Sequence, residues 1–455
     1  MESLLPPACR RDIDRARDLF LNTRGRWRII YHNDGDGVAS ASVLAHTLVR
    51  LQTPFQLTPL TDVDSEKMRT LVQESHGPIL VADTGTSLLP VLAAHDRPVL
   101  VLDHHRPPAG TAPTEKGPLL VNPHHWGVDG MTELSASMLC YLFALTLDPK
   151  NIDLIPWGLS GAIADRQHVG GFQGLNQVLL REAERRGELA TERALPLSGR
   201  TLGEALASTV DPYLVGISGH PEEAQSILQS LSLDPAASPE LLSPADRERL
   251  AGTLLARLVA QGARPEFCER VSETRYRFPR NPVDGVSLSL LQNATARENE
   301  PSVGIALALG DPRALAHAWE LEAKWRREVL HNLHAVEASV ERKDALQWFR
   351  VTEPSLGGAV AGYAITFFLD PTKPAFAMAP RGKFVKVSAR ATRWLVDNGL
   401  DLDAVCRKAA ESVHGQGGGH RVASGATIPP GTEERFLEVA SSVVGEQLSS
   451  LRGAA

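Results

Sequence analysis

Short apolar runs alternate with stretches of helical spacing along the first third of the chain. The runs 27–31, 78–82 and 98–102 have the length and composition of strands buried on both faces. Between them, residues 38–51 place apolar side chains at helical intervals, and 87–94 has the length of a short helix. Strands of this kind, separated by helices, predict a parallel α/β sheet.

The pattern changes after about residue 182, where polar-rich segments of helical spacing alternate with Pro and Gly. Residues 312–348 carry apolar side chains at helical spacing throughout and predict one long linker helix. Strand-like runs return at 359–369 and 383–389 and predict a smaller C-terminal α/β domain. We therefore predict an α/β protein of four parts: a parallel-sheet domain at 1–185, a mainly helical middle domain at 190–310, the linker helix at 312–348 and the C-terminal domain at 350–455.

Composition narrows the class of protein. Of 455 residues, 43% are apolar and 22% charged, which is typical of a globular protein. We find no uncharged apolar stretch of about 18 residues and no secretory signal, so we expect a cytoplasmic protein without membrane contact. The four cysteines form no CxxC pair, which favours reduced thiols over disulfides or a zinc site. A net charge of −7 argues against binding long nucleic acid by bulk charge, but allows a local basic groove.

Ionisable residues directly follow the predicted strands. The strand ends carry HNDGDG (32–37), DTG (83–85) and DHH (103–105), and a further carboxylate follows the small-residue run 158–164. The carboxyl ends of parallel strands share one edge, where ligands bind. In an extended backbone, alternation places the side chains of His32, Asp34 and Asp36 on one side. The candidates at this edge are His32, Asp34, Asp36, Asp83, Asp103, His104, His105 and Asp165.

Two interpretations compete for these carboxylates. A single Asp after a strand is ordinarily the N-cap of the next helix. Several carboxylates that converge without a cation, however, repel one another. Carboxylate and imidazole ligands without thiolate favour Mn²⁺, with Mg²⁺ or Co²⁺ as alternatives. The number of ligands indicates two ions, an arrangement used to hydrolyse phosphate esters.

The C-terminal part carries a second candidate site. Residues 381–393 contain five basic side chains and no acidic one. Further on, Gly417, Gly418 and Gly419 allow a phosphate to approach the backbone closely. A solvated edge strand followed by an ordinary glycine turn is the alternative. For His124 and His125 the alternatives are extra ligands, a structural loop or a substrate contact.

These motifs carry a family resemblance. HNDGDG (32–37), ADTG (82–85), LDHH (102–105) and IAD (163–165) resemble the motifs of the DHH phosphoesterase superfamily. GQGGGH (415–420) is similar to the glycine-rich signature of the DHH-associated C-terminal domain. The segments NPH (122–124), DPY (211–213) and GISG (216–219) resemble archaeal-type RecJ-like nucleases in particular.

The resemblance implies a role for each candidate residue. His32 and Asp34 would bind one ion, and Asp83 would bridge the two. The second ion would be bound by Asp36, His104 and Asp165. Asp103 would orient His104, and His105 would contact the scissile phosphate or its leaving oxygen. The implied substrate contacts in the C-terminal domain are Ser388, Arg390, the three glycines 417–419 and His420.

The implied activity is that of a manganese-dependent phosphodiesterase. We expect a RecJ-like exonuclease that hydrolyses single-stranded DNA or RNA to nucleoside monophosphates, with a role in DNA repair. A 5′ to 3′ polarity rests on the RecJ resemblance alone. One alternative is a nanoRNase-like enzyme that cleaves cyclic dinucleotides or short oligonucleotides. Another is a non-catalytic replication scaffold, although such proteins typically lose the metal ligands.

Overall fold

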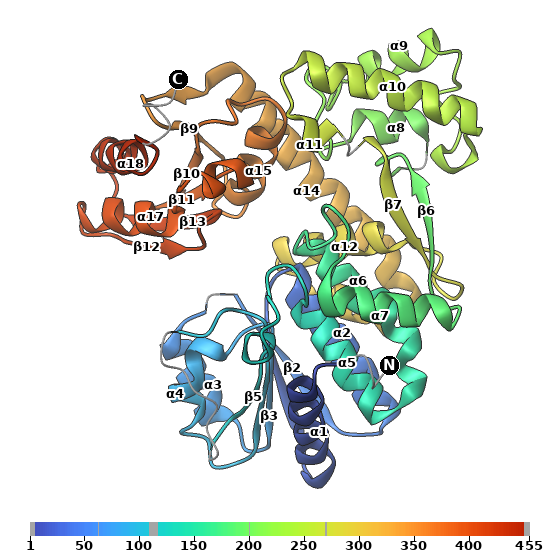
Figure 1. Ribbon diagram of the computed structural model, residues 1–455, viewed down its shortest axis with the longest axis vertical. Coiled ribbons are helices and arrows are strands. Elements are labelled where there is room, and N and C mark those ends of the chain that lie inside the picture. Colours follow the sequence, from blue (N-terminus) through green and yellow to red (C-terminus); the bar gives the residue numbers. More distant parts are fainter. Residues whose placement is uncertain (1–4, 62, 109–116, 200, 269–270, 450–455) are drawn as a thin grey trace. The chain divides into compact units, whose positions relative to one another are not determined.

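The computed structural model divides the chain into two compact units (Figure 1). Unit 1 comprises residues 1–192 and 274–325, and unit 2 comprises residues 193–273 and 326–455. Within them, the structure describes residues 5–61, 63–108, 117–199, 201–268 and 271–449. Residues 1–4, on which the expectation of no secretory signal partly rests, lie outside this range.

Unit 1 contains a parallel five-stranded sheet in the order β2-β1-β3-β4-β5. Each neighbouring pair of strands is parallel, which confirms the predicted α/β fold with its parallel sheet. The strands are β1 (Trp27–His32), β2 (Phe55–Leu60), β3 (Ile79–Ala82), β4 (Val99–Leu102) and β5 (Leu119–Val121).

Helices cover both faces of this sheet, because its strands carry apolar side chains on both faces. Ile79 and Val81 of β3 pack into the core on the side of α3 (Ser65–Glu74) and α4 (Leu89–Leu92). Leu80 and Ala82, which point the other way, join the core formed with α1, α2, α5 and α6. Figure 1 shows α3 and α4 on one side of the sheet and α1 on the other. The four helices of this second core are α1 (Pro7–Asn22), α2 (Gly35–Arg50), α5 (Ala136–Leu147) and α6 (Ile155–Ala164).

Helix α2 lies at the centre of unit 1 and is buried along most of its length. It is packed by α5 and α6, and also by α12 (Gly285–Arg297) and α13 (Pro301–Ala308) from much later in the chain. The packing is close: a Cβ on Gly304 of α13 would lie 2.8 Å from Val38 Cγ1 of α2. Residues 274–310 therefore belong to unit 1, although the sequence placed them in the middle domain. Unit 1 also contains α7 (Gly174–Arg185) and the short η2 (Thr86–Leu88), η3 (Pro123–Trp126) and η4 (Pro149–Leu154).

The middle of the chain, up to residue 273, is mainly helical. Its helices are α8 (Leu202–Ala207), α9 (Pro221–Ser230), η5 (Pro239–Leu241), α10 (Pro244–Ala260) and α11 (Pro265–Cys268). The flanking strands β6 (Ala190–Ala194) and β7 (Glu273–Arg277) form a two-stranded sheet that the sequence did not predict. The DPY segment packs against α14, where the Tyr213 hydroxyl donates to Glu337 Oε1 at 2.6 Å. The motif thus connects the helical segment to α14 within unit 2.

Two C-terminal elements differ from the prediction. Helix α14 (Pro312–Ser339) ends before residue 348, because the chain turns into β8 (Glu341–Arg342) and β9 (Gln347–Arg350). The apolar run predicted as a strand at 359–369 forms helix α15 (Gly357–Phe367) instead. Periodicity alone does not separate a short buried strand from a buried helix, and the many Gly and Ala residues here favour close helix packing.

The C-terminal sheet has six strands in the order β12-β13-β11-β10-β9-β8. Helix α15 packs on β10 and β11, whereas α17 (Leu402–Glu411) packs on β12 and β13 and also against α18 (Glu433–Gln447). The remaining elements are β10 (Ala375–Arg381), β11 (Phe384–Arg390), α16 (Arg393–Asp397), β12 (Gln416–Gly419) and β13 (Ala423–Ile428). This domain agrees with the predicted smaller α/β part of the fold.

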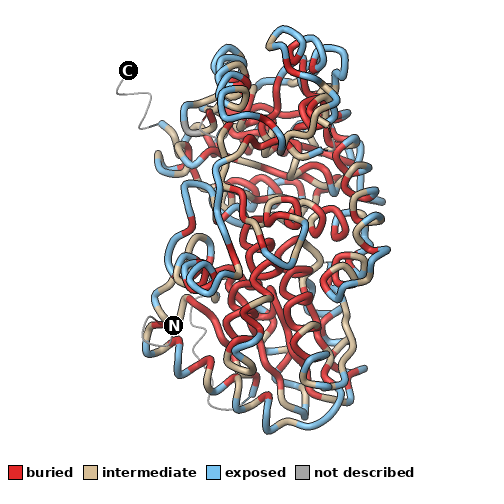
Figure 2. Tube along the Cα trace, turned by 90° about the vertical axis from the view of Figure 1, so that its right-hand side faces the viewer, coloured by how far each residue is buried: buried red, intermediate tan, exposed pale blue. Residues whose placement is uncertain are grey.

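Buried positions run along the interior strands and helices in Figure 2, and exposed positions follow the outer turns. All four cysteines are buried, and none of them forms a disulfide. No helix within the described part of the chain is both long enough and apolar enough to cross a bilayer.

Candidate metal centre

The carboxyl ends of the parallel strands bring the predicted metal ligands together. His32 is the last residue of β1, Asp83 follows β3, and His104 follows β4. Asp83 has a φ of 58°, a left-handed conformation that Asp adopts more readily than most residues. Three groups of possible ligand atoms, each within 4.8 Å of one another, are His32, Asp34 and Asp83; Asp36, His104 and Asp165; and Asp83, His104 and His105.

Asp83 lies between the first two groups. Its Oδ2 is 3.5 Å from His32 Nδ1, and its Oδ1 is 3.2 Å from His104 Nε2. The side chain is 1% exposed, yet among the described residues neither oxygen has a hydrogen-bond partner of good geometry. A buried carboxylate of this kind is costly unless a cation neutralises it. The donor set therefore fits divalent cations, with Asp83 facing both positions.

Asp34 and Asp36 also cap helices. Asp34 is the N-cap of α2: its Oδ1 accepts a hydrogen bond from Gly37 N at 3.0 Å, and its Oδ2 lies 2.9 Å from His32 Nδ1. Asp36 lies in the first turn of α2 and accepts hydrogen bonds from the first backbone N–H groups of α5, Ala136 and Ser137, at 2.8 and 3.1 Å. The interpretation as N-cap of the next helix is thus correct for Asp34, whereas Asp36 lies inside α2 and accepts from the start of α5; both residues also belong to the cluster. The extended alternation expected after His32 is wrong for Asp36, because α2 begins at Gly35.

His104 is held in one orientation by the backbone. Its Nδ1 donates to the Gly130 carbonyl at 2.7 Å, so Nδ1 carries the proton and Nε2 faces the carboxylates. Nε2 lies 3.5 Å from Oδ2 of Asp165, the C-cap of α6, and 3.9 Å from Asp36 Oδ2. Gly130 must be glycine here, since a Cβ would lie 1.9 Å from the His104 carbonyl oxygen.

Asp103 orients His105, and the expectation that it orients His104 is wrong. Its Oδ1 accepts from His105 Nδ1 at 2.8 Å, and its Oδ2 accepts from Thr86 N at 2.8 Å. The Nδ1 atom of His104 donates to the Gly130 carbonyl instead. Asn122 completes this arrangement by donating to the His105 carbonyl and to Thr86 Oγ1. The sequence singled out Asn122 as part of the NPH motif, but motif spacing did not indicate that it would bond to Thr86 and His105.

The cluster shifts the pKa values of its members. Burial and the neighbouring Asp83 carboxylate raise the pKa of Asp36 to about 7. Burial and Asp36 raise the pKa of Asp165 well above its ordinary value. Burial opposes the charged form of His104, but the surrounding carboxylates outweigh it and raise its pKa. The pKa of His105 is also raised, because Asp103 outweighs burial. These shifts reflect an excess of negative charge that divalent cations would relieve.

The predicted substrate residues gather on neighbouring strands of the C-terminal sheet. Ser388 and Arg390 lie on β11, and the register of β11-β13-β12 aligns Ser388, Gly425 and Gly418. His420 forms the turn between β12 and β13, donating its backbone N–H to the Ala423 carbonyl at 2.8 Å.

The N-terminus of α15 approaches the same face of β11. A Cβ on Gly358 would lie 2.4 Å from Arg390 Nη2, and one on Gly357 would lie 3.1 Å from Ser388 Oγ. This glycine pair was not marked as functional in the sequence, although it lets the guanidinium lie close to the helix.

The glycine run 417–419 lies in the edge strand β12, as the alternative interpretation of an edge strand expected. A Cβ on Gly417 would lie 2.3 Å from the Cys406 carbonyl oxygen of α17, and one on Gly419 would lie 2.8 Å from Ser424 Cα of β13. The Gly419 N–H donates to Asp403 Oδ1 at 2.8 Å. Close packing therefore accounts for Gly417 and Gly419 without a ligand.

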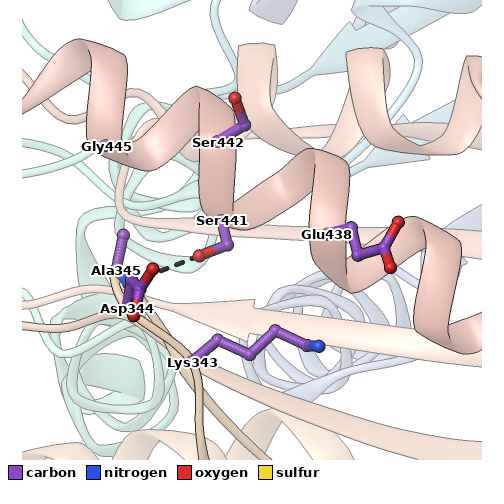
Figure 3. A pocket seen from close by; sticks show the side chains of 7 residues that line it. All are labelled: Lys343, Asp344, Ala345, Glu438, Ser441, Ser442 and Gly445. Carbon is purple, nitrogen blue, oxygen red and sulfur yellow. Dashed lines mark hydrogen bonds between the residues drawn. The ribbon is translucent and has the colours of Figure 1, made fainter.

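His124 and His125 belong to none of the three ligand groups found in the described part of the chain, and burial lowers the pKa of both. A pocket of about 500 Å³ lies in unit 2 beside α18 (Figure 3). There Ser441 accepts a hydrogen bond from Ala345 N at 3.3 Å, and Lys343 pairs with Glu434. None of the predicted site residues lines it.

Comparison with known proteins begins with the C-terminal domain. Residues 359–446 match the DHHA1 domain family. Over 437 residues, the chain is 27% identical to an uncharacterized protein of Methanocaldococcus jannaschii, an alignment that covers 95% of this chain and 96% of that one.

Solved structures show which fold the chain has. RecJ of Thermus thermophilus in complex with Mn²⁺ matches with a TM-score of 0.60 and 16% identity, over 97% of this chain and 55% of that one. The chain therefore spans about half the length of that RecJ. CDC45 of Entamoeba histolytica matches with a TM-score of 0.64 and 10% identity, over 96% and 98% of the two chains. The fold is thus shared by RecJ and CDC45.

Proposed function

This chain is a member of the DHH superfamily that resembles RecJ-like proteins, and on that premise we propose that it is a divalent-metal-dependent phosphodiesterase. One observation carries the proposal: neither oxygen of buried Asp83 makes a hydrogen bond of good geometry among the described residues, and each faces an imidazole nitrogen of a different group of possible ligands. A scaffold would gain nothing from a bare carboxylate in this position, whereas two cations would neutralise it.

We assign one cation to His32 and Asp34, the other to Asp36, His104 and Asp165, and both to Asp83. Bound there, Mn²⁺ or Mg²⁺ would supply Lewis-acid activation of a water and neutralise charge on the phosphate. Asp103 holds the His105 ring through Nδ1 and raises its pKa. We therefore assign His105 Nε2 as the donor to a phosphate or leaving oxygen, because a protonated ring stabilises the charge that develops there.

The proposed substrate is a single-stranded nucleic acid, hydrolysed from its end to nucleoside monophosphates. The basic stretch of β11 supports this, because Lys386, Ser388 and Arg390 alternate onto one face of the strand. Arg390 would bind a terminal phosphate as a planar two-point donor, and Ser388 would add a hydroxyl contact. A 5′ to 3′ direction is proposed from the RecJ likeness.

Short oligonucleotides or cyclic dinucleotides are the second candidate substrate. The net charge of −7 favours them, since a long strand requires a strong basic track. The likeness to CDC45 keeps a scaffold role among the outcomes to be tested.

A product time course with Mn²⁺ tests the activity. Single strands labelled at the 5′ or the 3′ end are incubated beside a dinucleotide, with wild type, Asp83→Ala and the control Asp153→Ala. Asp153 is a carboxylate of the same unit that pairs with Arg50 and lies outside the cluster. Immediate release of a mononucleotide from the 5′ label, lost only in Asp83→Ala, supports the proposal. Turnover of the dinucleotide alone selects the second candidate, and no turnover of any substrate contradicts the enzyme.

A further inference from the structure

A buried chain of amides lies behind His104. The Gly130 carbonyl that accepts from His104 Nδ1 also accepts from Gln167 Nε2, at 2.9 Å. Gln167 Oε1 in turn accepts from Asn176 Nδ2 at 2.6 Å. Gln167 is 5% exposed and Asn176 is fully buried, so water does not substitute for either contact. The chain connects two neutral side chains to one candidate ligand.

The geometry fixes which group donates at each step. A carbonyl only accepts, so the Gln167 amide must present its NH₂ group to Gly130 and its oxygen to Asn176. Asn176 is anchored separately, because its backbone N–H donates to the Glu133 carbonyl at 2.8 Å. The loop that holds Gly130 is closed by Asp129 N, which donates to Glu133 Oε2 at 2.7 Å. The position of the Gly130 carbonyl is therefore set from the end of α6, from α7 and from its own loop.

A purely structural clamp would not need this chain. The backbone bond from Asn176 already ties α7 to the loop, and apolar side chains of similar volume would fill the same space without burying polar groups. What the amides add is a fixed carbonyl, and hence a fixed direction for His104 Nε2, which faces Asp83 Oδ1 at 3.2 Å. Partners of this kind orient a ligating imidazole and tune its affinity for a metal.

We propose that Gln167 and Asn176 are positioning residues for His104, and that they set the affinity of the centre for its divalent cation. This inference rests on the proposed metal-dependent function. The hydrogen bonds that join these two side chains run to the Gly130 carbonyl and to each other, and not to the candidate ligands. Both act through the Gly130 carbonyl.

Mn²⁺ binding to the purified full-length protein, measured by calorimetry and by loss of the free-ion EPR signal, tests this together with thermal unfolding of the metal-free protein. Gln167→Met keeps the side-chain volume and removes both hydrogen bonds, and we expect about tenfold weaker Mn²⁺ binding. Asn176→Ser, a milder change, should weaken binding in the same direction.

The matched control is Gln347→Met in unit 2. Gln347 is also a fully buried glutamine that donates through Nε2 to backbone carbonyls, those of Asp370 and Lys373, at 2.7 and 2.9 Å. We expect this variant to lose thermal stability but to bind Mn²⁺ as wild type does.

The double variant Gln167→Met with Asn176→Leu separates the two roles, because it replaces the whole amide chain by apolar groups. We expect it to regain thermal stability relative to Gln167→Met while Mn²⁺ binding stays weak. Wild-type affinity in Gln167→Met or in the double variant overturns the inference. If wild type and Asp83→Ala bind Mn²⁺ equally, the proposed metal centre itself fails, which is a different result.

Discussion

The edge of the parallel sheet in unit 1 and the glycine-rich edge of the sheet in unit 2 place candidate residues in opposite ways. At the first edge Asp36 and Asp83 are buried, and neither oxygen of Asp83 makes a hydrogen bond of good geometry among the described residues. At the second, His420 is exposed, and close packing of β12 against α17 and β13 explains Gly417 and Gly419. The first edge holds buried charge that a bound cation would neutralise, whereas packing alone explains two of the glycines at the second.

This difference indicates which of the two sites is preorganised to bind its ligand. Helix N-termini and backbone carbonyls already orient the carboxylates and imidazoles of unit 1, so little reorganisation remains when a cation binds. On β11, the longer side chain of Arg390 keeps contact with solvent, so its interaction with a strand end is screened by salt. We expect substitutions in the metal cluster to abolish turnover, substitution of Arg390 on β11 to change affinity, and substitution of Gly417 to change stability.

The largest effect is expected from Asp83→Asn, which keeps the shape and removes the charge. Turnover should fall by about a thousandfold or more, because several kcal/mol of metal-based charge stabilisation are lost. The metal-free protein should be at least as stable as wild type, since one of several repelling carboxylates is gone. Steady-state kinetics and thermal unfolding in chelator measure the two effects. Destabilisation without loss of Mn²⁺ binding would show that Asp83 has a structural role only.

Gly417→Ala tests the packing explanation at the other edge. The new Cβ would lie 2.3 Å from the Cys406 carbonyl, a backbone atom that cannot move aside. We expect a loss of about 1–3 kcal/mol in the free energy of unfolding, as for overpacked cores. The control Gly362→Ala lies inside α15 with no atom within 4 Å of the new Cβ, and should stabilise by up to about 1 kcal/mol. Denaturant unfolding distinguishes them. Wild-type stability with weakened substrate binding would instead make Gly417 a phosphate contact.

The strand ends were predictable because a buried parallel strand has a distinctive apolar run, and the residues at its carboxyl end must lie near the shared edge. His32, Asp83 and His104 follow from that rule alone. Asp36 reached the same place by a different route, in the first turn of α2, because the extended alternation stops where the helix begins. The partner of Asp103 was not predictable, since adjacent histidines at a turn differ in direction, and only the fold decides which one meets Gly130.

Local composition was a weaker guide in unit 2. The apolar run at 359–369 has the residues of either a buried strand or a small-residue helix, and packing against β10 and β11 selected the helix. The glycines 417–419 illustrate the same limit, because both phosphate binding and close packing demand glycine. Only the contacts of the glycines with Cys406 and Ser424, which the sequence did not reveal, distinguish close packing from phosphate binding.

The pH dependence of stability sharpens the comparison from the side of unit 1. In the metal-free protein the pKa of Asp36 is raised to about 7, above its unfolded value of 3.8. The folded state therefore binds more protons, and its stability falls as the pH rises from about 4 to about 7. A cation that replaces those protons should stabilise more at about pH 7.5 than at about pH 5.5. Thermal unfolding with Mn²⁺ and with chelator measures this, and an equal shift at both values contradicts it.

The smallest expected effect belongs to Arg390→Gln, which tests the partly exposed face of β11 by salt dependence. If Arg390 contacts one phosphate, its loss should raise KM about tenfold and leave kcat nearly unchanged, because the contact is made equally before and during the reaction. The slope of log affinity against log salt for a single strand should become shallower by about 0.7, the contribution of one phosphate. Arg435→Gln is the control, an exposed arginine of α18 paired with Glu438. A fall in kcat for Arg390→Gln at constant KM would instead show that Arg390 stabilises the transition state, and that its role is not confined to binding the strand. The division between a buried edge for turnover and an exposed edge for affinity would then no longer hold.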